Sequence, residues 1–577
     1  MTRADVARVL AEIATLSELN GENPFRSRAF ASAARSLEGS DVDLEALARE
    51  GTLTSLSGVG PAIAETIREL VETGRSALYE ELKTATPIGL YDLLRIPGLG
   101  AKRIHTLHEA LGIDSLDALE EAARAGRIAS LSGFGARTEK KILAGLAFMR
   151  TSRGRRRYPE ALEVAVRLLL WLRERPGIHY AEIAGALRRR LEIVETVELV
   201  ASAEETSTLV EAFVQLNGVT QVVERGGGEH ALVELTDGLR ARLRCVPPER
   251  FTGALLWQTG SDAHLRELVE RAAAAGLRLD SDGLWQGDQL VQLADESSLY
   301  ERLGLAYIPP ELREGMGEVA LADAGPLPRL VELDDLRGTF HCHTTYSDGK
   351  ATVAEMAEAA RERGWSYLGL ADHSRAAAYA GGLSIERVRE QQREIDAWNQ
   401  ANAASGFRIF KGTESDILPD GSLDYPDEVL ASFDYVVGSV HSGFGISREE
   451  MTERVLRAVR NPYLTILGHP TGRLLLTREG YPLDVEAVLD AAAEHGVVVE
   501  INANPHRLDL DWRHLRYAAE RGVLIAINPD AHSVDGLEHV VFGVNSARKG
   551  GLEARQVLNT WALEEVGRYF EERRERR

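Results

Sequence analysis

The sequence predicts a multidomain α/β protein with an all-helical N-terminal region, a mixed α+β middle and a C-terminal distorted (β/α) barrel. Its 577 residues exceed what one hydrophobic core organises. Helical periodicity broken by glycine-rich turns fills the first 150 residues, and strand-like apolar segments alternate with helices after residue 337. We expect domains at residues 1–80, 81–152, 153–260, 261–316 and 337–577, with a linker at 317–336.

Composition narrows the class of protein. Hydrophobic residues make up 44% and no apolar run has the roughly 18 residues of a membrane span. Cys245 and Cys342 indicate neither a disulfide framework nor a thiolate zinc site. We therefore expect a cytoplasmic monomer with no signal peptide and no membrane partner.

The distribution of charge along the chain is relevant to whether the protein binds nucleic acid. The chain carries a net charge of −22, which argues against nucleic acid. However, the first 150 residues hold 18 Lys and Arg against 21 Asp and Glu, a net of −3, so −19 lies beyond them. DNA binding by the N-terminal region stays open.

Three turns in the helical region share one pattern, an apolar residue between two glycines followed by a helix start. The glycines are Gly58 and Gly60, Gly98 and Gly100, and Gly133 and Gly135, with bases at Lys102 and Arg137. Paired glycines permit a tight turn that exposes backbone N–H groups to phosphate at a helix N-terminus. The turns resemble helix-hairpin-helix motifs, which hold the DNA backbone without reading sequence. The alternative is three ordinary turns in which glycine only caps a helix.

Residues 23–30 offer two arginines and two aromatic residues ahead of a helix. Phe25, Arg26, Arg28 and Phe30 either meet a DNA end or supply core aromatics at a helix start. The sequence does not decide between these interpretations.

The middle region contains segments 183–190, 195–200, 243–248 and 259–261, in that order after the hairpin turns. They resemble the palm and thumb of a family X DNA polymerase, and the resemblance runs through residues 303–314 to the end of the chain. That family has a serine before an arginine pair and three aspartates that hold two Mg²⁺ ions. The corresponding residues here are Ala186 ahead of Arg188, then Thr196, Glu198 and Arg242.

These departures predict that nucleotide transfer is lost. An arginine about 5 Å from a divalent ion, at an effective dielectric near 20, is repelled by roughly 6–7 kcal/mol. The alternative is that the alignment is shifted and that carboxylates elsewhere hold the metal ions. The protein would then be an active gap-filling polymerase.

The barrel region contains predicted strands at 367–371, 435–440, 464–468, 497–501 and 524–527. Nine residues of the types that bind metal ions lie at the ends of barrel strands. They are His341, His343, Asp348, His373, Glu414, His441, His469, Asp530 and His532. Catalytic groups gather at the C-terminal ends of barrel strands, and alternate residues on an extended segment face the same side. Six histidines at such positions are too many polar rings to bury without partners. Nitrogen and oxygen donors suit Mn²⁺, Zn²⁺ or Fe²⁺, and nine ligands predict three ions.

These motifs resemble the PHP (polymerase and histidinol phosphatase) domain, which binds three metal ions and cleaves phosphoesters. We expect Arg375, Arg473 and Arg507 to clamp phosphate, with Asn502 and Asn504 nearby, and Asp372 either to orient a ligand or to cap a turn. Arg507 pairing only with Asp509 is the alternative.

Together the resemblances imply a DNA repair enzyme acting on gapped, nicked or 3′-ended DNA. The implied activities are 3′→5′ exonuclease, 3′-phosphatase and abasic-site endonuclease. Competing hypotheses are a non-catalytic DNA-end-binding adaptor and a small-molecule phosphatase.

Overall fold

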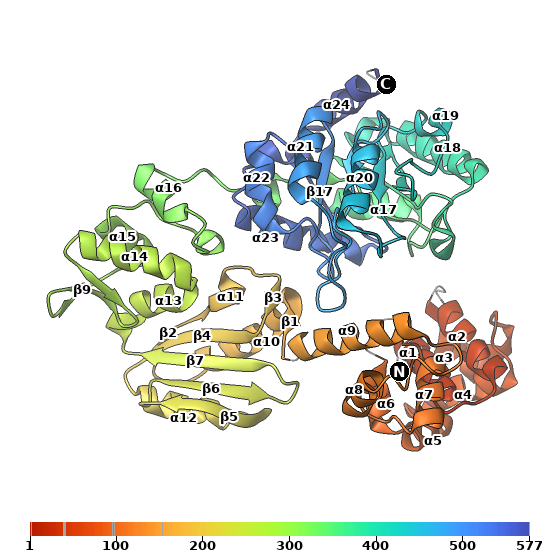
Figure 1. The fold of residues 1–577 in the computed structure, drawn as a ribbon, viewed down its shortest axis with the longest axis horizontal. Helices are drawn as coiled ribbons and strands as arrows, with labels where there is room; N and C mark the ends of the chain where they lie inside the picture. Colours follow the sequence, from red (N-terminus) through yellow and green to blue (C-terminus); the bar gives the residue numbers. More distant parts are fainter. Residues whose placement is uncertain (2, 39–41, 95, 97–98, 153, 576–577) are drawn as a thin grey trace. The chain divides into compact units, whose positions relative to one another are not determined.

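The computed structural model describes residues 1, 3–38, 42–94, 96, 99–152 and 154–575. The chain forms two compact units, residues 1–153 and 154–577, and Figure 1 traces both. The mixed α/β multidomain architecture predicted from the sequence is confirmed.

The first unit is entirely helical over its described residues. Its helices are α1 (Arg3–Leu19), α2 (Pro24–Glu38), α3 (Leu44–Glu50), α4 (Pro61–Thr73), α5 (Ala77–Ala85), α6 (Ile88–Leu93), α7 (Ala101–Leu111), α8 (Leu116–Arg124) and α9 (Ala136–Ser152). One core forms among α1–α5 and a second mainly among α6–α9. Phe30 is buried in the first core, which agrees with the core interpretation for that ring, whereas Phe25 is 76% exposed.

The second unit begins with a five-stranded sheet ordered β2-β4-β7-β6-β5. The elements of this region are β1 (Arg156–Arg157), α10 (Tyr158–Arg173), β2 (Ile178–Ala184), α11 (Gly185–Arg188), β3 (Ile193–Val194), β4 (Thr196–Ala203), α12 (Thr206–Val214), β5 (Val219–Gly226), β6 (His230–Leu235) and β7 (Arg240–Val246). Strands β1 and β3 pair with each other in a separate antiparallel sheet. β4 and β7 run parallel, and the other neighbours are antiparallel. Helices α10 and α12 pack on this sheet and close its core.

A smaller helical subdomain follows. It contains α13 (Phe251–Thr259), α14 (Asp262–Ala274), β8 (Arg278–Asp280), β9 (Gly283–Gln286), β10 (Gln289–Leu290), α15 (Glu296–Arg302) and α16 (Glu318–Ala324). The predicted linker at 317–336 is therefore partly helical. Val319 and Ala322 of α16 enter the subdomain core because their apolar spacing gives that helix a buried face.

The remaining elements alternate strand and helix around a barrel. They are β11 (Gly338–Thr339), α17 (Val353–Glu362), β12 (Tyr367–Leu370), α18 (Ile385–Ala401), β13 (Arg408–Lys411), β14 (Glu414–Asp416), α19 (Asp427–Leu430), β15 (Val437–Ser439), α20 (Arg448–Val459), β16 (Ile466–Leu467), α21 (Val485–His495), β17 (Val498–Asn502), α22 (Leu515–Glu520), β18 (Ile525–Asn528), α23 (Val540–Lys549) and α24 (Leu563–Glu575).

All pairings between these strands are parallel, in two sheets ordered β11-β12-β13 and β14-β15-β16-β17-β18. Parallel bridges join the sheets between Cys342 and Ala531 and between His373 and Glu414. The strands at 367–371, 435–440, 464–468, 497–501 and 524–527 are confirmed. Buried aliphatic runs such as 497–501 form these strands because both faces are covered.

Candidate metal centre

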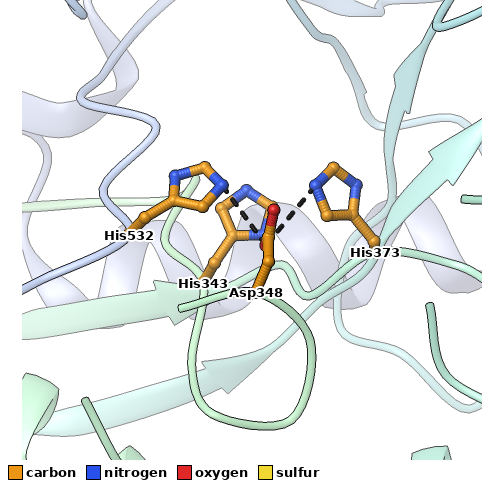
Figure 2. A group of neighbouring side chains, drawn as sticks. All are labelled: His343, Asp348, His373 and His532. Carbon is orange, nitrogen blue, oxygen red and sulfur yellow. Dashed lines mark ion pairs between the residues drawn. The ribbon is translucent and has the colours of Figure 1, made fainter. Parts of the chain in front are cut away.

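Three histidines, which follow strands β11, β12 and β18, meet around Asp348 (Figure 2). These histidines are His343, His373 and His532, and together with Asp348 they form a group able to hold a metal ion. One Asp348 carboxylate oxygen lies 3.3 Å from Nε2 of His532, 3.7 Å from Nε2 of His373 and 3.9 Å from Nδ1 of His343. The side chains of Asp348 and His532 are partly exposed, so this group is open to solvent.

Two further groups share members with the first. His341, His343 and Asp530 form one, and His373, Glu414 and His441 form the other. Asp530 lies 3.2 Å from Nε2 of His343, and Glu414 lies 3.3 Å from Nε2 of His441. These three groups contain eight of the nine predicted ligands. The ninth, His469, lies outside them but places Nε2 2.9 Å from Glu414.

Backbone conformation at the centre is unusual in two places. Asp530 has φ 53° and His469 has φ 22°, values that residues other than glycine seldom adopt. Such conformations persist only where surrounding structure enforces them, and they concentrate at functional sites. Both lie directly after barrel strands, which aims their side chains at the centre.

The donor atoms fit divalent ions. Among the described residues, Nε2 of His341, both ring nitrogens of His343, Nδ1 of His373 and Nδ1 of His469 are buried without a hydrogen-bond partner. Leaving such nitrogens unpaired in a protein interior is costly, and coordinating a metal removes that penalty. Nitrogen and carboxylate donors without thiolate are the set that Mn²⁺, Zn²⁺ and Fe²⁺ accept.

Electrostatics at the centre support the same fit. Burial alone would raise the pKa values of Glu414 and Asp530, but the surrounding histidines hold both well below the usual range. Burial and the neighbouring His532 lower the pKa of His343 to about 4. The carboxylates are thus ionised and His343 is neutral near pH 7, whereas the nearby carboxylates raise the pKa values of His373, His441 and His532. A bound metal ion would take the place of the protons on these three rings.

Two buried carboxylates behind the histidines were not anticipated as site residues. His341 donates from Nδ1 to Glu500 at 2.8 Å, and His441 donates from Nδ1 to Asp416 at 2.6 Å. Each bond leaves Nε2 of its histidine directed at the centre. The sequence signals were a charged residue inside the apolar strand β17 and a second acid two residues after Glu414.

The predicted supporting residues separate into different environments. Asp372 contacts no predicted ligand side chain. It accepts hydrogen bonds from Thr344, Ser347 and Gln391, which fixes the loop leading to Asp348. These hydrogen bonds favour the interpretation in which Asp372 caps a turn.

The three arginines also differ. Arg507 lies 3.6 Å from Asp530 at the centre, whereas Arg375 pairs with Asp424. Arg473 instead binds Asp511 and the carbonyls of Arg507 and Leu508, so its guanidinium is used within the protein. Asn502 donates to Asp530 at 3.0 Å, which ties a predicted amide to a candidate ligand.

The glycine-rich turns of the first unit have the expected helix starts. Helices begin at Pro61, Ala101 and Ala136, directly after the second glycine of each turn. Gly58 and Gly133 have φ of 78° and 83°, and space is open above Gly60, Gly100, Gly133 and Gly135. Lys102 and Arg137 are exposed. Gly98 lies outside the described residues.

The five-stranded sheet brings together the residues predicted to correspond to the palm carboxylates. Glu198 on β4 and Arg242 on β7 are paired in register, with Oε1 and Nε 3.9 Å apart, and Glu224 lies 3.8 Å from the same guanidinium. Thr196, two residues before Glu198, faces the same side. Ala186 follows Gly185, where any Cβ would fall 1.8 Å from a Glu198 oxygen. The groups of potential ligands among the described residues all lie in the barrel.

A barrel with a buried histidine and carboxylate centre is the arrangement of a metal-dependent phosphoesterase. Comparison with protein families agrees: residues 339–504 match the PHP domain and residues 254–314 the DNA polymerase beta thumb. Residues 1–76 match a helix-hairpin-helix domain and residues 90–147 a SAM-like helix-hairpin-helix tandem.

Similarity to one relative extends over nearly the whole chain. The DNA polymerase/3′-5′ exonuclease PolX of Bacillus subtilis (strain 168) is 35% identical over 571 residues, 98% of this chain and 99% of the relative. The chain belongs to the bacterial family X DNA polymerases that carry a PHP domain.

Other relatives match only the barrel region. A probable phosphatase of Caldanaerobacter subterraneus subsp. tengcongensis is 30% identical over 182 residues, 29% of this chain and 63% of the relative. A probable phosphatase of Thermoanaerobacter sp. (strain X514) is 31% identical over 169 residues, 28% of this chain and 62% of the relative. Among the described residues, no helix has the length and apolar character needed to cross a bilayer.

Proposed function

We propose that this protein processes DNA 3′ ends in repair by hydrolysing phosphoesters in its PHP domain. Its main activity is 3′→5′ exonuclease, with 3′-phosphatase and abasic-site endonuclease as further activities. The observation that carries the proposal is the convergence of nine histidine and carboxylate side chains at the strand ends of a barrel. The helix-hairpin-helix turns in the same chain supply the means to hold DNA.

Three divalent ions, Mn²⁺, Zn²⁺ or Fe²⁺, would occupy the three overlapping groups of ligands. When bound, such ions supply an activated water and stabilise charge that develops on phosphorus. Glu500 and Asp416 hold His341 and His441 with Nε2 toward the centre. Arg507 is positioned to contact a phosphate oxygen near Asp530.

We further propose that the palm has lost nucleotide transfer. The Arg242 guanidinium lies between Glu198 and Glu224, in the region where family X members hold Mg²⁺. Arg188 makes two hydrogen bonds to Glu296, at 2.6 and 2.9 Å, which leaves little of its charge for a triphosphate. Its role is then to join the palm to the thumb.

DNA binding by the helix-hairpin-helix turns is part of the proposed function. The partner is gapped, nicked or 3′-ended DNA bound without sequence preference, since backbone amides at Gly58, Gly100 and Gly133 contact phosphate alone. The protein acts as a monomer in the cytoplasm. We assign the domains to residues 1–80, 81–152, 153–260, 261–316 and 337–577.

The phosphoesterase is tested with 5′-labelled DNA and Mn²⁺. Wild type is expected to shorten the DNA from its 3′ end, and His341→Ala to abolish shortening. His495→Ala, which removes an exposed histidine on α21, is the matched control and should retain full activity. Equal activity of His341→Ala and wild type would contradict the proposal.

A second candidate function is hydrolysis of small phosphate monoesters. It is favoured by the match of the barrel to relatives described as probable phosphatases. Relative values of kcat/KM for a DNA 3′ end and for a free phosphate monoester distinguish the two functions.

A further inference from the structure

An exposed aromatic ring borders the candidate metal centre. Tyr379 is 74% exposed, yet its ring centroid lies 6.3 Å from that of His373 and 6.4 Å from that of His441. A tyrosine carries a large apolar surface that proteins usually bury or use to bind a ligand. Its position beside two candidate metal ligands indicates a binding role.

The loop that carries Tyr379 is held at both ends. The backbone N–H of Ser374 donates to the Glu414 carbonyl at 2.9 Å, and that of Leu383 donates to the His373 carbonyl at 2.9 Å. Gly382 packs so closely that a Cβ there would fall 2.0 Å from the Ser374 carbonyl oxygen. The ring is thus presented from an anchored loop, which lowers the entropy lost when a ligand packs on it.

A second contact anchors the middle of the loop. The N–H of Ala376 donates to the Asp424 carboxylate at 2.7 Å, and Arg375 donates to the Asp424 carbonyl at 2.8 Å. This pairing places a guanidinium that is about half exposed next to the Tyr379 turn. The loop that carries Tyr379 is therefore anchored in its middle as well as at its ends.

The tyrosine ring suits a nucleotide because it is flat, large and uncharged. Every nucleobase has a π-face, so stacking on tyrosine accepts any base.

We propose that Tyr379 stacks on the base of the 3′-terminal nucleotide while its phosphodiester lies at the metal centre. Stacking makes the exonuclease reaction faster on base-bearing DNA ends than on abasic ends and simple phosphate esters, so abasic-site cleavage is the slower of the proposed activities. The inference rests on the proposed phosphoesterase function and names a residue that determines its substrate.

The kinetic test uses two 5′-labelled oligonucleotides that differ only at the 3′ end, which carries either a normal nucleotide or an abasic tetrahydrofuran residue. Wild type should prefer the base-bearing end. Tyr379→Ala should reduce the ratio of the two kcat/KM values by about 5- to 100-fold, whereas Tyr379→Phe, which keeps the ring, should preserve it. An unchanged ratio in Tyr379→Ala would overturn the proposal.

A binding measurement separates this inference from the proposed function. A 3′-terminal 2-aminopurine joined through a phosphorothioate diester suppresses cleavage and reports stacking by loss of fluorescence. Wild type and Tyr379→Phe should quench it, and Tyr379→Ala should not. Quenching without hydrolysis of any DNA would contradict the proposed function but support stacking. Equal quenching by wild type and Tyr379→Ala would overturn stacking.

Discussion

A buried carboxylate behind the centre, Glu500, controls how His341 presents its ring. Glu500 accepts from Nδ1 of His341 and from the side-chain amides of Asn502 and Asn528. A carboxylate partner fixes the tautomer and strengthens the other nitrogen as a ligand. Glu500 therefore acts as a positioning residue through His341.

Replacing Glu500 should weaken metal binding. Glu500→Gln is expected to lower affinity for Mn²⁺ by about 10- to 100-fold, because the amide cannot match the carboxylate as an acceptor. Titration calorimetry of the metal-free protein measures this directly. Glu494→Gln, on the exposed side of α21, is the control and should bind Mn²⁺ as wild type does. Equal affinities of Glu500→Gln and its control would exclude the role.

Arg507 and Arg473 should respond differently to truncation. Arg507→Ala is expected to lower kcat/KM on DNA by about 10- to 100-fold, with metal content retained, because a charge-assisted contact to phosphate is lost. Arg473→Ala should instead lower the melting temperature, since its carbonyl partners lose their donor. Activity assays and thermal unfolding of both variants distinguish binding from support. If Arg473→Ala lowered kcat/KM and Arg507→Ala lowered the melting temperature, the two roles would be exchanged.

Most of the candidate ligands could be named from the sequence because they follow apolar strands, where barrel side chains converge. Glu500 could not, because a lone charge within Val498–Asn502 does not reveal its partner. The partners of Arg473 are mainly backbone carbonyls of a loop, and residue type carries no information about carbonyl positions.

At the scale of elements, helix α15 joins the palm to the thumb through Glu296. Its carboxylate binds Arg188 from α11 and the fully buried Arg313. Burial alone would raise the pKa of Glu296, but the two arginines lower it to about 2. The ionised carboxylate therefore stabilises the folded state.

Glu296→Gln should destabilise the second unit by about 3 kcal/mol near neutral pH, the equivalent of its pKa shift. Because the folded-state pKa is lowered, this stability is present above about pH 4.5 and is lost as pH falls toward about 2. Urea unfolding at about pH 7 and about pH 3 measures both effects. The control, Glu301→Gln on the exposed side of α15, should change little. A pH-independent difference would contradict the ion-pair account.

Element boundaries were predicted with mixed success for a physical reason. Helix starts after Gly60, Gly100 and Gly135 follow from local turn chemistry, which the sequence contains. The helical part of residues 317–336 depends on burial against α14, a contact that proline-rich flanks conceal.

For the whole molecule, the proposed function assigns DNA binding and hydrolysis to different sites. In that proposal backbone amides at the glycine-rich turns bind phosphate without the ions of the metal centre, whereas hydrolysis requires those ions. Removing metal with a chelator should abolish hydrolysis and leave affinity for gapped duplex within about twofold. Fluorescence anisotropy with labelled duplex measures the affinity. A complete loss of binding would mean that metal also organises the DNA-binding surface.

The central claim, a PHP nuclease on a palm without nucleotide transfer, is tested most directly by one reaction. A 5′-labelled primer in a gapped duplex is incubated with Mn²⁺, with and without dNTPs, beside His343→Ala and Asp530→Ala. Primer shortening is expected under both conditions, with loss of shortening in both variants and no extension. Extension that persists in the variants would contradict the central claim and establish an active polymerase.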